Sequence, residues 1–254
     1  MEINLVPKFI DEAVSPPARA VGNTLSNLWE LGIGNHISLW IKKQETRHHQ
    51  NLESYKKSIE EKTQSIPQEN LVEPPLNVVG PAIEASKYYI DSEELRNMFA
   101  NLIASSIDKD RIEKVHPSFV EIIKQLSPLD AKILNLFTLN NSYTICEFRI
   151  KDKNKQGFKT YMTNVFLELD KISDLNLVSS SINNLNRLGL IQLSYTDHFA
   201  DERLYEKFEL TPQFKALQAQ LKNNPVLITS FAHIQKGIIE TTQFGKNFIS
   251  ICLS

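Results

Sequence analysis

The sequence predicts a mainly α-helical protein, in which an N-terminal helical module precedes a winged-helix-like α+β unit. Two observations lead to this fold class. Apolar residues recur at three- and four-residue spacings over most of residues 1–137, which is the pattern of helices with one buried face. Further along the chain, helical patterns are followed by short runs rich in strand-forming residues, and the order helix, helix, helix, hairpin is that of a winged helix.

Length and composition are those of a globular protein. At 254 residues the chain is long enough for one large domain or two of ordinary size. Charged residues make up 23% of the chain, hydrophobic residues make up 41%, and the net charge is −2. Residues 1–126 hold 18 acids and 14 bases, a net charge of −4, whereas residues 127–254 hold 12 acids and 14 bases, a net charge of +2. The C-terminal half is therefore the better suited to an anionic partner.

We expect three segments: residues 1–66 with amphipathic helices and a long polar helix, residues 67–126 as a helical core module, and residues 127–254 as the winged-helix-like domain. Cys146 and Cys252 stand far apart without a CxxC pair, which indicates neither a disulfide framework nor a zinc site. The sequence shows no signal-peptide pattern and no apolar run of about 18 residues. The expected location is the cytoplasm, with membrane association as the alternative.

The N-terminal segment contains two amphipathic stretches. Residues 3–14 carry apolar side chains at helical spacing, and Ser15-Pro16-Pro17 predicts the end of that helix. Residues 21–41 repeat the pattern, and basic residues follow directly. This second stretch is compatible with an interfacial membrane helix, and the alternative is a pair of helices that packs on the core. In the membrane interpretation the contact residues are Trp29, Trp40, Lys42 and Lys43.

The next segment is more polar. In residues 41–66 a narrow apolar stripe that includes Leu52, Tyr55 and Ile59 predicts a long helix with one apolar side. A narrow stripe is typical of helix pairing, so self-association is one interpretation. A solvated helix on a monomer is the other.

Residues 73–81, EPPLNVVGP, place three prolines and a glycine in an apolar passage. We interpret this segment as a packing elbow that leads into a helix, with a ligand-binding loop as the alternative. Gly80 is expected to allow the close approach of a neighbouring helix. Asp91 and Glu94 then have the spacing of a capping box for the clearest helix in the chain.

The C-terminal segment begins with Ser127-Pro128-Leu129-Asp130, which predicts a capped helix through Phe137. Strand-forming and helical patterns alternate after it. In chain order they predict a strand over 143–148, a polar loop over 151–157, helices over 161–172 and 178–188, and a hairpin of strands 191–195 and 204–210.

The common motifs of catalysis and cofactor binding do not occur in the sequence. The patterns GxxxxGK[ST], GxGxxG, GxSxG and HExxH are absent, and eight glycines leave little material for a phosphate-binding loop. Glu113 and His116 are spaced to share a helix face, but a di-iron bundle needs such a pair twice. We therefore expect a protein without enzyme activity, catalytic residues, metal or cofactor.

Polar and basic residues of the C-terminal segment form the candidate binding site. A winged helix presents its third helix to the DNA groove and its hairpin to the flanking backbone. Winged helices also bind proteins, so nucleic acid and protein are both candidate partners. The candidate contact residues are Lys151, Lys153, Lys155, Ser181, Asn184 and Arg187.

Four longer motifs carry a family resemblance. They are LVEPPLNVVGPAIEASKYYIDSEELRNMFANLIASSIDKD, HPSFVEIIKQLSPLDAKIL, NNLNRLGLI and the terminal TTQFGKNFISIC. Together they resemble the Abi-alpha (abortive infection alpha) family of bacterial proteins, over about residues 65–254 and most strongly over 71–137. The resemblance implies a part in bacterial defence against phage, and it brings no catalytic residues to this chain.

The leading interpretation is a phage-defence protein that acts by binding and assembly, with a protein partner or self-association. One alternative is a membrane-perturbing effector that uses its N-terminal amphipathic helices for peripheral membrane contact. The other is a nucleic-acid-binding regulator of the winged-helix class.

Overall fold

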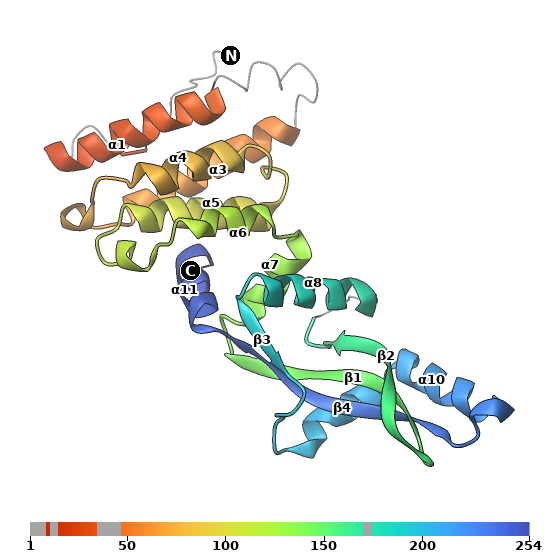
Figure 1. The fold of residues 1–254 in the computed structure, drawn as a ribbon. Coiled ribbons are helices and arrows are strands. Elements are labelled where there is room, and N and C mark those ends of the chain that lie inside the picture. Colours follow the sequence, from red (N-terminus) through yellow and green to blue (C-terminus); the bar gives the residue numbers. More distant parts are fainter. Residues whose placement is uncertain (1–8, 11–14, 35–46, 170–173, 254) are drawn as a thin grey trace. The chain divides into compact units, whose positions relative to one another are not determined.

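The computed structural model describes residues 9–10, 15–34, 47–169 and 174–253, and the chain divides into two compact units. The helical unit comprises residues 1–132 and 247–254, and the sheet unit comprises residues 133–246. The chain passes between the units within α7 (Pro128–Leu136) and again within α11 (Gln243–Cys252). Helices predominate, and the strands form one antiparallel sheet, so the fold class is α+β (Figure 1).

The helical unit is built around α5 (Glu93–Ser106), which contacts its neighbours on several sides. Met98, Phe99 and Leu102 of this helix are fully buried. Ser92 begins the helix by accepting the backbone N–H of Leu95, so the predicted capping role of Asp91 is wrong by one residue. The surrounding elements are α1 (Pro16–Trp29), η1 (Glu30–Gly34), α3 (Arg47–Gln64), η2 (Gln68–Asn70), α4 (Leu76–Ser86), η3 (Ile112–Lys114) and α6 (Ser118–Lys124).

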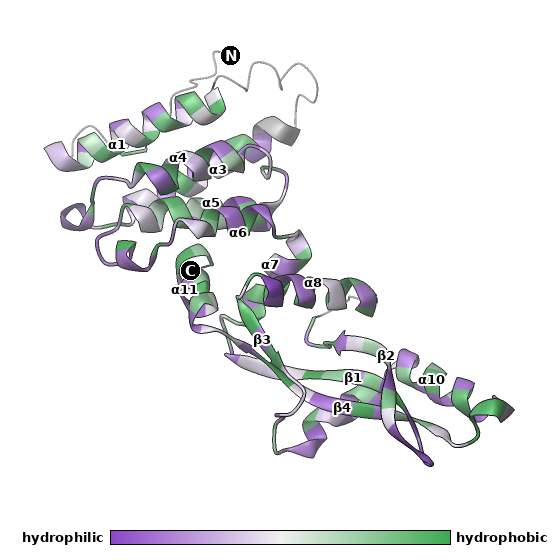
Figure 2. Ribbon diagram, in the orientation of Figure 1, coloured by the Kyte–Doolittle hydropathy of each residue, from purple (hydrophilic) through white to green (hydrophobic). Residues whose placement is uncertain are grey.

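The stripe predicted in residues 41–66 lies on α3 and is buried inside the helical unit. Leu52, Tyr55 and Ile59 have exposed fractions of 9%, 0% and 1%. Because the unit's own core covers this stripe, it is not an open seam for pairing with a second chain. Figure 2 shows hydrophobic and hydrophilic residues interspersed along the helices of this unit.

The proline-rich segment 73–81 leads into α4, which begins at Leu76 and contains Pro81. Val78 and Val79 are buried, in agreement with a packing role, whereas Leu76 is 61% exposed. A Cβ atom added at Gly80 would meet nothing within 4 Å, so the prediction that this glycine allows close helix approach is wrong. The segment places an apolar helix face and leaves its glycine facing open space.

The sheet unit contains four antiparallel strands in the order β2-β1-β4-β3, which form a curled sheet (Figure 1). On one face Cys146, Phe148 and Val165 pack against Phe214 and Leu217 in a buried cluster. The helix that precedes β3 contacts β2 and β3, and its Leu175 joins the same buried cluster. The bounds are β1 (Ser142–Asp152), β2 (Lys155–Val165), α8 (Leu175–Arg187), β3 (Ile191–Ser194), η4 (Glu202–Tyr205), α9 (Glu206–Glu209), α10 (Pro212–Lys222), η5 (Pro225–Leu227) and β4 (Ser230–Thr241).

Three predicted elements of this unit are wrong. The polar loop expected over 151–157 is only a turn at 153–154, because β1 continues to Asp152 and β2 begins at Lys155. Residues 161–165, expected in a helix, complete strand β2, where Met162 pairs with Phe148. Residues 204–210, expected as a strand, are helical in η4 and α9. Tyr205 and Phe208 are both buried, and their three-residue separation places them on one side of a helix but on opposite faces of a strand.

The winged-helix prediction is not confirmed. The long hairpin is formed by β1 and β2 and precedes α8, whereas a wing would follow the third helix. Strand β3 pairs with β4, a strand for which the sequence analysis made no assignment. The predicted helix over 178–188 and the strand near 191–195 are confirmed as α8 and β3.

Candidate functional site

The antiparallel register places a row of side chains across three strands on one face of the sheet. Lys151 of β1 lies directly opposite Phe158 of β2 on one side and Phe231 of β4 on the other. Directly opposed residues of antiparallel strands project from the same face, so the row reads Phe158, Lys151, Phe231. In the next row Arg149 of β1 lies opposite His233 of β4. We call these five residues the distal face.

The aromatic residues of the distal face are unusually exposed for their type. Phe158 is 53% exposed and Phe231 is 40% exposed. The other face of the same strands is filled by the buried cluster around Phe148 and Phe214, whose rings lie 5.0 Å apart. Large apolar side chains that remain exposed in a patch mark an interaction surface more often than scattered single residues do.

Arg149 holds Phe158 in place. Its guanidinium carbon lies 3.8 Å from the centre of the Phe158 ring, in a cation–π contact. The Nε and Nη2 atoms donate to Oε2 of Glu147 at 2.7 and 2.6 Å, and Nη1 donates to Oε1 of Gln235 at 2.9 Å. Because these partners occupy the guanidinium and its side chain is only 13% exposed, Arg149 positions the ring rather than serving as a free cation.

A polar network joins strand β2 to helix α8 and to Tyr195. Asn164 of β2 has a positive φ of 50°, a conformation that asparagine tolerates better than most residues. Its side-chain oxygen accepts the hydroxyl of Tyr195 at 2.7 Å, and its amide nitrogen donates to Asn183 of α8 at 2.8 Å. Burial, and then the charge of Glu147, raise the pKa of Tyr195 well above its usual range, so the phenol stays protonated and donates.

The end of the sheet that carries the distal face is strongly basic. Residues 149–159 contain the five bases Arg149, Lys151, Lys153, Lys155 and Lys159 and the single acid Asp152, a net charge of +4. The remainder of the sheet unit holds eight bases and ten acids, a net charge of −2. In Figure 2 the tip of the β1–β2 hairpin is correspondingly hydrophilic. The charge of the unit is therefore concentrated at one end.

His233 reports the local electrostatic potential. Burial lowers the pKa of its imidazole, and the positive charges of Lys151 and Arg149 lower it further. The pKa of Asp152 at the hairpin is also lowered, because the backbone N–H of Asn154 and the hydroxyl of Thr229 donate to its carboxylate. The shift of His233 is thus due first to burial and that of Asp152 first to its own hydrogen bonds, and the neighbouring cations add to both.

We expect Lys151→Gln to raise the pKa of His233. Removing a neighbouring positive charge makes protonation of the imidazole less costly, whereas the contribution from burial stays. Titration of the His233 ring signals by NMR measures the change. Lys222→Gln, an exposed substitution on α10, is the control and should leave the pKa unaltered. An unchanged pKa in Lys151→Gln would show that the lysine does not face His233.

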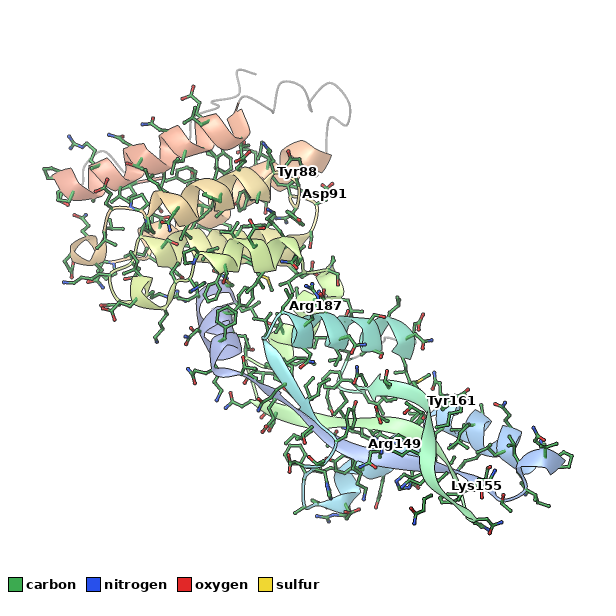
Figure 3. All side chains as sticks on the ribbon, in the orientation of Figure 1. Tyr88, Asp91, Arg149, Lys155, Tyr161 and Arg187 are labelled. Carbon is green, nitrogen blue, oxygen red and sulfur yellow. The ribbon has the colours of Figure 1, made fainter. Side chains whose placement is uncertain are left out.

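The structure separates the predicted binding residues into two places. Lys151, Lys153 and Lys155 lie on the β1–β2 hairpin. Arg187 is exposed near the end of α8 and donates to Asn184, apart from Lys155 at the hairpin (Figure 3). Ser181 is 6% exposed and so faces the interior, where it cannot reach a bound chain.

The aromatic half of the surface is not among the residues that the sequence predicts for binding. Phe158 and Phe231 come from strands that are distant in the sequence and meet only through β1. A signal was present in residues 230–235, where Phe231, His233 and Gln235 alternate with the more apolar Ala232 and Ile234. Such alternation is typical of a strand with one covered and one open face.

The predicted membrane-contact residues fall in the helical unit or outside the described residues. Trp29 is only 2% exposed, with ring centres 5.5 Å from Phe9 and 5.6 Å from Tyr55. This placement favours the core-packing alternative for Trp29. Trp40, Lys42 and Lys43 lie outside the described residues. Within the described part of the chain, no helix has the length and hydropathy of a membrane span.

Among the residues that the structure describes, no group of three or more acidic, histidine or cysteine side chains is placed to hold a metal ion. His116, considered above with Glu113, lies with Nδ1 2.6 Å from the Ser118 hydroxyl and accepts the backbone N–H of Ser118 at 3.2 Å. The ring nitrogen thus takes part in the start of α6.

Fold and site together define an α+β protein with a helical unit and a sheet unit that presents a basic, aromatic face. Residues 47–252 match the family described as Abortive infection alpha, and the chain belongs to this family. The family indicates a role in abortive infection, a form of phage defence. No curated protein and no solved structure matches the chain.

Proposed function

We propose that this protein takes part in phage defence inside the cell by binding an anionic partner through the distal face, rather than by catalysis. The observation that carries the proposal is the row Phe158, Lys151, Phe231 beside a hairpin turn that adds Lys153 and Lys155. Family membership supplies the defence role, and the concentrated charge supplies the class of partner.

The lysines of this surface are suited to an external anion. In the described part of the chain, Lys151, Lys153 and Lys155 form no ion pair, in contrast to Lys207, which pairs with Glu168 in the same unit. Lys155 lies opposite Asp152 and helps to lower the pKa of that carboxyl group, so part of its charge is balanced within the hairpin. Exposed cations attract polyanions over about one Debye length, roughly 8 Å at physiological salt. Binding through such groups should weaken steeply as salt rises.

We expect the triple variant Lys151→Glu, Lys153→Glu, Lys155→Glu to lose most of its affinity for a polyanion. Wild type should elute from a heparin column at clearly higher salt than this variant. The same variant should also lose protection in cells where wild type reduces phage plating. Affinity should fall because three attractive contacts become repulsive. The fold should stay intact because the three side chains lie outside the buried cluster of the sheet unit.

A matched control distinguishes the effect of the distal face from the effect of total net charge. The variant Lys215→Glu, Lys222→Glu, Lys246→Glu alters the same total charge at three exposed positions of α10 and α11. We expect it to keep most of the heparin affinity and the protection. Equal losses in both variants would show that the distal face has no special role, and the proposal would then fail.

A further inference from the structure

We propose that the anionic partner of the distal face is single-stranded nucleic acid, whose bases stack on Phe158 and Phe231 while its phosphates contact Lys151, Lys153 and Lys155. This inference rests on the proposed function, since it names the chemical class of the partner bound at the same surface. It depends on exposed rings and lysines that occur together on one surface. Lysines alone would indicate only an anion, and exposed rings alone would indicate only an apolar partner.

The spacing of the two rings allows two bases of one strand to be bound. Phe158 and Phe231 occupy β2 and β4, which flank β1, so their backbones are separated by two strand spacings, or about 10 Å. Lys151 stands between them in the same row. An extended nucleic-acid strand that crosses the sheet can therefore place a base on each ring and a phosphate near the intervening ammonium group.

The Phe158 ring is held ready for stacking. Arg149 covers one side of the ring at 3.8 Å, and Phe158 nevertheless keeps an exposed fraction of 53%. Because Glu147 and Gln235 fix the guanidinium, the ring loses little freedom when a base arrives. A phenylalanine kept exposed and oriented in this way has a surface that a base can cover.

A duplex would not use these rings. In double-stranded nucleic acid the bases are stacked on one another and the phosphate backbone lies outside, so only the lysines would contribute. An acidic peptide would likewise engage the lysines but has no planar groups for both rings. Single strands are the anionic polymers that use both kinds of side chain on this surface.

Protection of a sheet edge does not account for the arrangement. Lysines on an edge strand prevent pairing with other chains, and this explanation suits Lys155 and Lys159 on β2. Lys151, however, lies on the inner strand β1, and Lys153 lies in the turn. Phe231 lies on β4 beyond the short stretch that pairs with β3, so it stands at a local edge, where a phenylalanine gives none of the protection that a charged residue would give.

The test is fluorescence anisotropy with the full chain and four labelled probes: oligothymidylate and oligouridylate of about 20 nucleotides, a DNA duplex of matched length, and a polyglutamate peptide. We expect both single strands to bind more tightly than the duplex and the peptide at low salt. The difference between the two single-stranded probes decides whether DNA or RNA is preferred. Duplex or peptide binding as tight as single-strand binding would overturn the inference.

Variants of the rings give the decisive comparison. Phe158→Ala and Phe231→Ala should each weaken single-strand binding by roughly 5-fold to 150-fold, the range that corresponds to about 1–3 kcal/mol for one stacked base. The salt dependence should stay near that of wild type, because no phosphate contact is removed. Leu177→Ala, at a 58% exposed leucine of α8, is the control and should bind as wild type does. Thermal unfolding of each variant verifies that the sheet unit is folded.

The lysine triple variant gives the complementary result. Each phosphate contact to a single strand contributes about 0.7 to the slope of log K against log salt. The loss of three contacts should therefore make this slope less steep by about 2. If this variant loses binding but both phenylalanine variants bind as wild type does, the anionic-partner proposal stands and the single-strand inference is wrong. If wild type binds heparin but no nucleic acid, the single-strand inference is wrong and the anionic-partner proposal stands. If wild type binds neither heparin nor nucleic acid, both proposals are wrong.

Discussion

Gly245→Ala is expected to unfold the sheet unit or to lower its free energy of unfolding by more than about 4 kcal/mol. A Cβ atom at Gly245 would lie 1.9 Å from the carbonyl oxygen of Leu190 and 2.8 Å from its carbonyl carbon. Both atoms belong to the backbone, so no side-chain rotation relieves the overlap. Urea denaturation followed by circular dichroism measures the loss.

The surrounding hydrogen bonds explain why Leu190 cannot move aside. Its carbonyl accepts the backbone N–H of Thr242 at 3.1 Å, and the Thr242 hydroxyl donates to the carbonyl of Gly189 at 2.6 Å. The same hydroxyl accepts the N–H of Gly245 at 2.8 Å at the start of α11. Shifting the Leu190 carbonyl away from a new methyl group would break several of these bonds at once.

Gly80→Ala is the matched control, because it makes the same chemical change where space is open. Beyond its chain neighbours and the backbone of its own helix α4, no atom lies within 4 Å of a Cβ built at Gly80. Alanine is the better helix former by up to about 1 kcal/mol, and the following Pro81 opposes this gain because it disfavours helical backbone at a residue with a Cβ, so this variant should stay within about 1 kcal/mol of wild type. A Gly245→Ala protein with the wild-type denaturation midpoint would contradict the described contact between α11 and Leu190.

The helices that could be predicted are those with local signals at their ends. Ser127 and Asp130 form a reciprocal cap at the start of α7: the Ser127 hydroxyl accepts the Asp130 N–H at 3.1 Å, and the Asp130 carboxylate accepts the Ser127 N–H at 2.7 Å. The sequence shows this cap directly, because both residues lie within one turn. Helix α8 likewise ends where Gly189 takes a positive φ of 72°.

Elements that depend on distant partners were harder to predict. Residues 161–165 have an apolar pattern that a helix also satisfies, and only pairing with β1 selects the strand. Residues 15–17 show a related ambiguity, because Pro16 and Pro17, expected to end a helix, occupy the first turn of α1. In both cases the local pattern allows two structures, and contacts with distant segments select one of them.

The candidate site divides in the same way. Its lysines are clustered in the sequence, so charge counting identified Lys151, Lys153 and Lys155 before any fold was known. The aromatic partners required the register of three strands, two of which are remote from each other in the chain. Ser181 was selected on the assumption of an exposed recognition helix, and the amphipathic packing of α8 buries it instead.

Trp29→Ala is expected to lower the free energy of unfolding of the helical unit by about 3–5 kcal/mol, the usual cost of removing a fully buried large aromatic side chain. Trp29 is 2% exposed, stacks on Tyr55 of α3 and meets the edge of Phe9. Its removal therefore leaves a cavity between segments that no other side chain fills without rearrangement. Urea denaturation monitored by circular dichroism gives the change in stability.

Leu31→Ala is the control for this variant, because Leu31 lies two residues away in η1 and is 68% exposed. We expect it to change stability by less than about 0.5 kcal/mol, as exposed positions usually do. Flotation with anionic liposomes distinguishes the two roles proposed for Trp29. If Trp29→Ala kept the wild-type midpoint but lost liposome binding that wild type shows, the tryptophan would serve membrane contact, and its burial against Tyr55 and Phe9 would not describe the protein in solution.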